Sequence, residues 1–257
     1  MIALFDSGLG GLSVLREVRS RLPQHDLLYL ADTAYCPYGV RPDSFVQQRS
    51  LQIGRSLLDY GVRLLVVACN TASSAALEVL RAELPIPVVG MEPGLKPAIA
   101  ATHNGSIGVL ATSGTLAGER FARLVERFAH QQTVITQPCP GLVEQVERGT
   151  IDDPTTDELL KQYIEPLLTK GIDTLVLGCT HYPFLREPIV RLVGSGITII
   201  DTGPAVARQV EHMTSKHNIV PGNAATDYFT TGNAESVTST LKRLLGETIT
   251  AQSIEII

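Results

Sequence analysis

Residues 63–80 read RLLVVACNTASSAALEVL, and this stretch decides the fold. A nearly continuous apolar run, 63–69, ends in a cysteine and passes directly into a sequence with the apolar spacing of a helix. A strand without polar alternation is buried on both faces, which is typical of a parallel sheet covered by helices. The stretch therefore predicts a strand followed by a helix, with Cys69 at the carboxyl end of the strand.

The same order of strand and helix recurs through the first hundred residues. Apolar runs cover 2–5, 26–32 and 87–91, while stretches at 12–22 and 44–60 have helical spacing. Strands that alternate with helices predict a parallel sheet with helices on both of its faces.

The pattern then begins a second time. The stretch SIGVLATSGTLAGERF (106–121) is similar to IALFDSGLGGLSVLRE (2–17), and TLVLGCTHYPFL (174–185) is similar to the stretch quoted first. The later strand of each copy ends in a cysteine, Cys69 in the first copy and Cys179 in the second. We interpret the chain as two similar units of strands and helices.

The predicted fold class is α/β, with two similar doubly wound parallel-sheet domains that face each other across an active-site cleft. A stretch that contains glycine and proline, 90–97, marks the division between them. The first domain is expected to comprise residues 1–97 plus 207–257 and to carry the first strand-end cysteine. The second domain is expected to comprise residues 98–206 and to carry the other.

The composition fits a globular protein and disfavours several classes. The 257 residues are 44% hydrophobic and 18% charged, which is too apolar for a disordered chain. A formal net charge of −5 disfavours nucleic acid as the main partner, because phosphate binding needs a basic surface. Apolar runs such as 64–69 are too short to span a membrane. The N-terminus lacks the basic segment of a signal peptide, so the four cysteines are expected as free thiols in the cytoplasm.

Small polar residues follow the predicted strands, at the edge of the sheet where ligands bind. Lys and Arg are almost absent there, so a ligand carboxylate is expected to bind neutral donors and backbone N–H groups such as those of Tyr38 and Gly39. Asp6 is the natural partner of a ligand ammonium, and an ammonium with carboxylates indicates an amino acid. The alternative is that Asp6 and the hydroxyl residues merely cap helices. The other candidate binding residues are Ser7, Asn70, Thr71, Thr112, Thr115, Thr180 and His181.

Cys69 and Cys179 suit an acid–base reaction. Cys69 is expected at the N-terminus of a helix, where the dipole and the backbone N–H groups favour a thiolate and lower its pKa. Two thiols on opposite faces of a substrate can invert a stereocentre without a cofactor, because one takes a proton from carbon while the other gives one to the opposite face. The alternative is that both are ordinary buried cysteines.

Three further residues are candidates for support of the two thiols. Asp6 is expected to serve Cys69, and His181 and Glu147 are expected to serve Cys179. The alternatives are an ordinary hydrogen-bonded histidine and a glutamate on a solvated helix face. The other two cysteines, Cys36 and Cys139, do not lie at the ends of predicted strands. We interpret both as ordinary thiols.

No cofactor and no metal site are expected. The glycine-rich segment 8–11 lacks the third glycine of a dinucleotide turn, with Ser13 in its place, and Asp6 would repel a pyrophosphate. Cys179 and His181 stand two residues apart, but there is no Cys-x-x-Cys pair beside them. The glycines are interpreted as a tight turn into a helix.

The sequence resembles the bacterial glutamate racemases, which are cofactor-independent members of the aspartate/glutamate racemase superfamily. The matching segments follow the family's order over nearly the whole chain, and the pair ACNTAS and GCTHYP is highly specific. These segments are FDSGLGGLSV (5–14), DTAYCPYG (32–39), ACNTAS (68–73), GVLATSGTL (108–116), LVEQVE (142–147), LGCTHYPFL (177–185) and IIDTGPAVA (199–207).

This resemblance implies an amino-acid racemase, an isomerase that interconverts L- and D-glutamate and supplies D-glutamate for peptidoglycan synthesis. It implies that Cys69 deprotonates the D-isomer and Cys179 the L-isomer, in a homodimer. It also implies substrate contacts at Asp6-Ser7, Tyr38-Gly39, Asn70-Thr71 and Thr180-His181. Two alternatives stay open. One is an aspartate or broad-specificity racemase of the same superfamily, and the other is a non-catalytic small-molecule binding or regulatory protein, which would need neither thiol.

Overall fold

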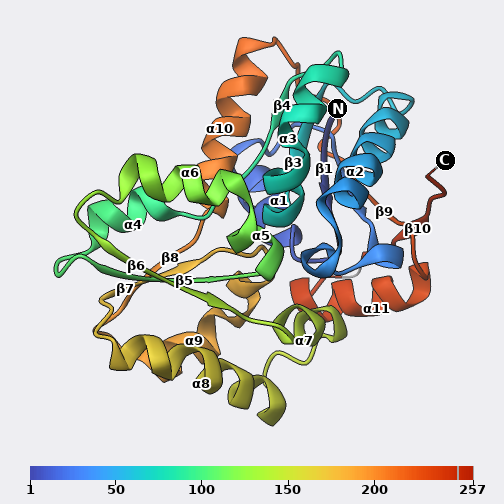
Figure 1. Cartoon of the computed structure of the whole chain (residues 1–257). Coiled ribbons are helices and arrows are strands. Elements are labelled where there is room, and N and C mark those ends of the chain that lie inside the picture. Colours follow the sequence, from blue (N-terminus) through green and yellow to red (C-terminus); the bar gives the residue numbers. More distant parts are fainter. Residues whose placement is uncertain (248, 257) are drawn as a thin grey trace.

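The computed structural model describes residues 1–247 and 249–256, which form two lobes, each built on its own sheet (Figure 1). The larger sheet has six parallel strands in the order β10-β9-β2-β1-β3-β4. These are β1 (Ile2–Asp6), β2 (Leu27–Ala31), β3 (Leu64–Val67), β4 (Val88–Val89), β9 (Thr226–Thr230) and β10 (Gln252–Ser253). The C-terminal segment thus returns to the first lobe, where β9 pairs with β2.

Helices cover both faces of this sheet, which explains its uninterrupted apolar strands. Helices α1 (Leu12–Arg21) and α10 (Gly203–Lys216) pack together on one face, and α2 (Asp43–Leu58) and α3 (Asn70–Glu83) on the other. Successive residues of a strand point to opposite faces. Within β1, accordingly, Ile2 and Leu4 join the cluster of α1, whereas Ala3 and Phe5 join the cluster of α2 and α3.

The smaller sheet has four parallel strands in the order β6-β5-β7-β8. They are β5 (Ser106–Ala111), β6 (Thr133–Pro138), β7 (Thr174–Leu177) and β8 (Thr198–Ile200). One face packs against α4 (Leu95–Ala101) and α6 (Glu119–Phe128). The hydrophobic cluster of the other face includes residues of α7 (Leu142–Arg148), α8 (Pro154–Thr169) and α9 (Arg186–Val193).

The two sheets repeat one arrangement, since the strand order β2-β1-β3-β4 of the first corresponds to β6-β5-β7-β8 of the second. The predicted fold class of two similar doubly wound parallel-sheet domains is confirmed. The repeat differs in its helices. α3 follows β3 directly, whereas a short 3-10 helix, η3 (Tyr182–Leu185), stands between β7 and α9. After β5 the helix is divided into α5 (Ser113–Ala117) and α6.

The largest hydrophobic cluster joins the two lobes. It extends from α1 and α10 in the first lobe to α7, α8 and α9 in the second, and it includes the buried side of α11 (Ala234–Leu245). Chain limits of 1–97 plus 207–257 and 98–206 remain our proposal for the two domains. Around this boundary α10, which begins at Gly203, packs along α1 of the first lobe.

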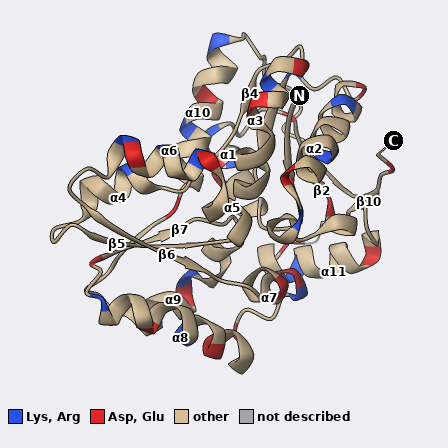
Figure 2. Cartoon of the chain, viewed as in Figure 1, with Lys and Arg blue, Asp and Glu red and all other residues tan. Residues whose placement is uncertain are grey.

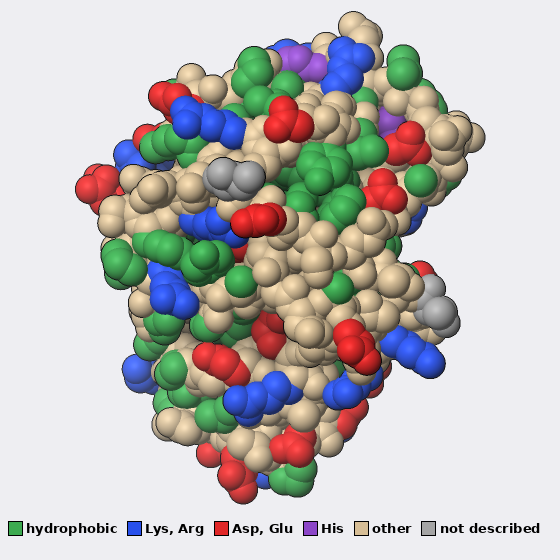
Figure 3. Space-filling view, turned by 90° about the vertical axis from the view of Figure 1, so that its right-hand side faces the viewer, with side chains coloured by type: hydrophobic (Ala, Val, Ile, Leu, Met, Phe, Trp, Pro, Cys, Tyr) green, Lys and Arg blue, Asp and Glu red, His purple; other side chains and the backbone are tan. Residues whose placement is uncertain are grey.

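Charged residues lie mainly on the peripheral helices, with both signs mixed (Figure 2). On the face that Figure 3 displays, acidic and basic side chains are scattered and intermixed, and hydrophobic side chains gather in a patch in its upper half. Among residues 1–247 and 249–256, none of the helices combines the length and the apolar character that a membrane crossing requires.

Candidate active site

The carboxyl ends of the central strands bring the predicted site residues together. Asp6 is the last residue of β1, Cys69 lies between β3 and α3, and Cys179 lies between β7 and η3. All three are buried, with Asp6 completely inaccessible and the two cysteines 5% and 6% exposed. Polar and ionisable groups from both sheets therefore meet in one buried region between the lobes.

Cys69 is the N-cap residue of α3, as the sequence predicts. Its sulfur accepts a hydrogen bond from the backbone N–H of Ala72 at 3.4 Å, and the thiol donates to Ser7 Oγ at 3.9 Å. The expected lowering of its pKa is wrong for this arrangement. Burial, followed by the charge of Asp6, raises the pKa of the Cys69 thiol to about 12, because desolvation outweighs the N–H bond. The charge of Cys179 contributes to this rise, so the two sulfur atoms lie within electrostatic range of each other.

Cys179, His181 and Glu147 contact one another in series. Its sulfur lies 3.7 Å from His181 Nδ1, and His181 Nε2 lies 2.5 Å from Glu147 Oε1. Burial acts to lower the pKa of His181, but hydrogen bonds to Cys179 and Glu147, together with their charges, raise it well above the usual value. The histidine is therefore held as a cation between two acidic groups. The alternative of a glutamate on a solvated helix face does not hold, because the Glu147 side chain is only 19% exposed and bonds His181. His181 is a hydrogen-bonded histidine whose two partners are the acidic groups of Cys179 and Glu147.

Asp6 connects the two cysteine environments. Its Oδ1 accepts hydrogen bonds from Ser7 Oγ and the backbone N–H of Gly8, both at 3.0 Å, while Oδ2 accepts from Thr180 Oγ1 at 2.8 Å. Burial raises the pKa of Asp6, whereas the charge of His181 and these hydrogen bonds lower it in part. The N-cap residue of α1 is Gly11, so Asp6 does not cap that helix. Its hydrogen bonds extend from the first lobe to the second.

The glycine-rich segment is the main contact of the first lobe with the His181 side. The backbone N–H of Leu9 donates to Glu147 Oε1 at 2.6 Å, and that of Gly10 lies 3.2 Å from His181 Nε2. A Cβ atom at Gly10 would stand 2.6 Å from Thr180 Oγ1 and would also collide with the His181 ring. Glycine is needed here because the His181 and Thr180 side chains approach the Gly10 backbone this closely.

Hydroxyl residues from both lobes meet beside the first cysteine. Thr71 Oγ1 lies 2.9 Å from Thr112 Oγ1 and 3.4 Å from Thr115 Oγ1. Thr112 is also the N-cap residue of α5, and its side chain accepts a hydrogen bond from the backbone N–H of Thr115. The alternative of a capping role therefore holds for Thr112, which in addition contacts Thr71 of the other lobe. Gly39 lies against the Thr112 side chain, which places the segment 38–39 at the same point.

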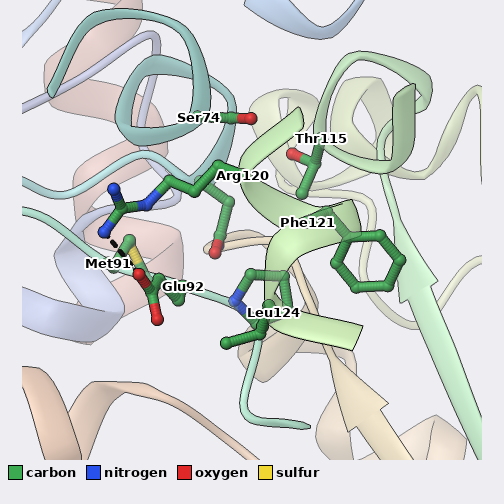
Figure 4. A pocket seen from close by; sticks show the side chains of 9 residues that line it. Ser74, Met91, Glu92, Thr115, Arg120, Phe121 and Leu124 are labelled. Atoms are coloured by element: carbon green, nitrogen blue, oxygen red, sulfur yellow. Dashed lines mark hydrogen bonds and ion pairs between the residues drawn. The ribbon is translucent and has the colours of Figure 1, made fainter. Parts of the chain in front are cut away.

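Asn70 differs from its neighbours, because neither atom of its buried side-chain amide has a hydrogen-bond partner. Asn70 also lines a small cavity between α3, the segment 91–93 and α6, with room for the centre of about one water molecule (≈ 10 Å³). Ser74 and Arg120 line the same cavity, and Arg120 pairs with Glu92 (Figure 4). The cavity lies directly behind the first residue of α3.

Sequence reasoning missed two groups near the site. Cys36, Glu147 and His181 offer possible metal ligands within 4.8 Å of one another. A metal there would have to displace the Glu147–His181 hydrogen bond and remove the proton of Cys36, whose pKa is raised by burial. The second group is an ion pair of Asp32 with Arg49 behind Tyr38. Spacing gives no signal for either group, since the members come from separate segments.

Comparisons with known proteins agree on one group of enzymes. The chain matches the Asp/Glu/hydantoin racemase family model over residues 12–210. It is 50% identical to the glutamate racemase of Ectopseudomonas mendocina over 249 residues, 96% of this chain and 95% of that protein. A glutamate racemase structure from Bacillus anthracis superposes with a TM-score of 0.90 at 34% identity, over 100% of this chain and 97% of the other. The Escherichia coli glutamate racemase, solved with L-glutamate and the activator UDP-MurNAc-ala, gives 0.88 at 32% identity, over 100% and 98%.

Proposed function

Because the chain belongs to the Asp/Glu/hydantoin racemase family, we propose that it interconverts L- and D-glutamate with Cys69 and Cys179 as the two acid–base groups. The observation that carries this proposal is the continuous set of contacts from one cysteine to the other. Cys69 reaches Asp6 through Ser7, and Asp6 reaches the Cys179 side through Thr180. A substrate Cα between the two sulfur atoms would have one on each face.

The proposed reaction moves two protons and no other atoms. In the D-to-L direction the Cys69 thiolate takes the proton from Cα, and the electron pair left on carbon is delocalised into the adjacent carboxylate. The Cys179 thiol then gives its proton to the opposite face of that carbon, which inverts the centre. Cys69 ends as a thiol and Cys179 as a thiolate, so the enzyme is then ready for the L-isomer.

His181 and Glu147 support the Cys179 side of this scheme. A cationic His181 beside the sulfur stabilises the thiolate that forms there, and Glu147 stabilises the cation from the other ring nitrogen. Asp6 is the proposed partner of the substrate ammonium and serves the Cys69 side, since it is the buried carboxylate between the two cysteines. The proposed reaction uses no cofactor and no metal.

Neutral groups are proposed to hold the two carboxylates of glutamate. Asn70 supports this assignment, because the hydrogen-bonding capacity of its buried amide is unused. Gly39 lies beside Thr112, so the backbone N–H groups of Tyr38 and Gly39 are proposed as further donors. The further proposed contacts are Ser7, Thr71, Thr112, Thr115, Thr180 and His181.

The proposal extends to the role of the product and to the assembly. D-glutamate from this reaction would supply peptidoglycan synthesis in the cytoplasm, with the enzyme acting as a homodimer. Sedimentation velocity tests the assembly, since a dimer has twice the 27.7 kDa mass of one chain. A single species at the monomer mass over the working concentration range would refute the dimer.

The activity itself is tested by incubating L-glutamate with purified enzyme and separating the product enantiomers by chiral chromatography. D-glutamate is expected without pyridoxal phosphate, nucleotide or metal, and with a chelator present. The same assay with L-aspartate distinguishes a racemase for aspartate or of broad specificity. A protein that binds glutamate without turnover would instead be the non-catalytic alternative. In deuterated water the inverted product should carry deuterium at Cα, whereas retention of hydrogen would contradict a two-base mechanism.

A further inference from the structure

Behind the segment 38–39 lies a fully buried carboxylate, Asp32, at the end of β2. Its Oδ1 accepts from Arg49 Nη2 and from Thr231 Oγ1, both at 2.8 Å. Its Oδ2 accepts from Arg49 Nε at 3.0 Å and from the hydroxyl of Tyr38 at 2.5 Å. Each oxygen thus has two donors, one of them from the two-pronged guanidinium of Arg49.

Arg49, the partner of Asp32, is buried as well and also contacts an aromatic ring. It projects from α2 with 7% of its surface exposed, and its guanidinium lies 4.5 Å from the centre of the Tyr35 ring. Burial acts to lower the pKa of Arg49, but the hydrogen bonds and charge of Asp32 raise it overall, so the pair is ionic. Burial and then the charge of Asp32 raise the pKa of Tyr38, so its hydroxyl remains a donor.

Tyr38 and Gly39 link this pair to the proposed site. The Tyr38 ring is 1% exposed and packs in the same hydrophobic cluster as Cys69. Gly39 lies against the Thr112 side chain of the other lobe. The ion pair therefore fixes one side of a short segment whose other side meets the hydroxyl residues of both lobes.

We propose that Asp32 and Arg49 form a positioning pair that sets substrate affinity by fixing the backbone of Tyr38 and Gly39. This inference rests on the proposed function, because it assigns a binding role to those two N–H groups. Neither member of the pair contacts the cysteines. Loss of the pair should therefore raise KM, while the proton transfers and hence kcat are retained.

The test compares two arginines of one helix. Arg49→Lys keeps the charge but cannot make the two-pronged contact, and about a tenfold rise in the KM for glutamate is expected with kcat changed less than about threefold. Arg55→Lys is the matched control, because Arg55 lies on α2 as well but forms an exposed pair with Glu83. That variant is expected to keep the wild-type KM and kcat.

A second variant removes the other donor to Asp32 Oδ2, which is the hydroxyl of Tyr38. Tyr38→Phe retains the ring and removes only the hydroxyl that bonds Asp32, so it is expected to fold and to raise KM. Because both substitutions act through one carboxylate, the double variant should raise KM no further than the larger single effect. Calorimetric titration with D-glutamate checks that the rise in KM is a loss of affinity.

Three results would overturn the positioning role. These are a fall in kcat at unchanged KM, a wild-type KM in both variants, and a double variant whose effects multiply. Failure of the proposed function has a different signature, since the wild-type enzyme would then neither racemise nor bind glutamate. A Tyr38→Phe variant with normal thermal unfolding and weakened binding would support positioning even if Arg49→Lys fails to fold.

Discussion

At Cys69, burial and hydrogen bonding act on one sulfur atom in opposite directions. The N–H group of Ala72 favours the thiolate, but removal of water from the site disfavours it more strongly. The thiol is therefore protonated near neutral pH in this buried arrangement. The base that the reaction requires forms only in the fraction of molecules that have lost this proton.

A pH dependence follows for the D-isomer. Below its raised pKa of about 12, the thiolate fraction of Cys69 increases tenfold for each pH unit. We expect kcat/KM for D-glutamate to rise between about pH 6.5 and 8.5, before the substrate ammonium titrates. Initial rates at constant ionic strength measure this profile. A kcat/KM that is flat or falls over that range would contradict a raised pKa in the free enzyme.

Replacement of each cysteine by serine tests whether Cys69 and Cys179 act as the two acid–base groups. Cys69→Ser and Cys179→Ser should each lower kcat/KM by about three orders of magnitude, because an alkoxide is far harder to generate than a thiolate with the same neighbours. Chiral chromatography of the product measures the loss. Cys139→Ser is the control, since Cys139 is a buried cysteine whose thiol bonds the backbone carbonyl of Gln137 and which transfers no proton in the proposed reaction. Full activity in either of the first two variants would remove that residue from the mechanism.

Sequence alone could place the cysteines but not all of their surroundings. Strand-end position and the match between two copies single out Cys69 and Cys179. The direction of the Cys69 pKa shift could not be predicted, because it depends on how completely water is excluded. Arg49 could not be found either, since a buried arginine in an amphipathic helix has the same spacing as an exposed one such as Arg55.

Among the elements, the strands could be predicted directly from the sequence, whereas the segments that follow them could be predicted less well. The apolar runs at 2–5, 63–69 and 174–177 all form strands at the centre of a sheet. The segment after β7 forms a 3-10 helix, with Pro183 in its first turn, although the similar segment after β3 forms a long helix. A proline in the first turn of a helix costs no backbone hydrogen bond, and α8 and α10 also carry one there, so Pro183 does not explain this departure.

Asp173, which precedes β7, allows a prediction about the stability of the second lobe. It accepts hydrogen bonds from Thr102 Oγ1 at 2.5 Å and from the backbone N–H groups of His103 and Asn104 at 2.6 and 2.7 Å. Burial opposes ionisation, but these bonds lower the pKa of Asp173 to about 2. Because the folded pKa lies below the unfolded value, this stabilisation is present above about pH 4 and is lost as the pH falls toward 2.

Asp173→Asn should therefore lower Tm by about 2 °C at pH 7, which corresponds to about 1 kcal/mol for a partly exposed carboxylate in a chain of this size. The difference from wild type should shrink as the pH is lowered from 4 to 2.5 in scanning calorimetry. Asp59→Asn is the control, because Asp59 is exposed at the end of α2. A difference in Tm that stays constant across this pH range would exclude the carboxylate as its source.

For the whole molecule, burial of the site implies that the lobes must separate. Both cysteines are nearly inaccessible and Asp6 is fully buried, so glutamate can reach them only when the contacts between the lobes open. The contacts beside the site itself are hydrogen bonds, such as those of the Leu9 N–H with Glu147 and of the Ser13 hydroxyl with the Thr180 carbonyl. Such bonds can be exchanged for bonds to water or substrate, which is compatible with opening and closing in each turnover.

The two chain segments that cross between the lobes meet at Gly94. A Cβ atom there would lie 2.8 Å from Ile200 Cγ2 and 3.3 Å from Thr202 Cγ2, so one methyl group would force the crossings apart. Gly94→Ala should change kcat and KM together, by about two- to tenfold, because substitutions at a hinge alter opening and closing rather than the proton transfers. Gly196→Ala is the control, since a Cβ atom at Gly196 would meet nothing within 4 Å.

The dependence of the rate on solvent viscosity separates a hinge effect from simple loss of stability. If lobe movement limits turnover, kcat of Gly94→Ala should fall more steeply with added glycerol than kcat of Gly196→Ala, while the primary isotope effect of Cα-deuterated glutamate becomes smaller. Thermal unfolding of both variants shows whether Gly94→Ala is merely less stable. Equal viscosity slopes, with an unchanged isotope effect, would mean that the crossings hold the lobes together without governing their motion.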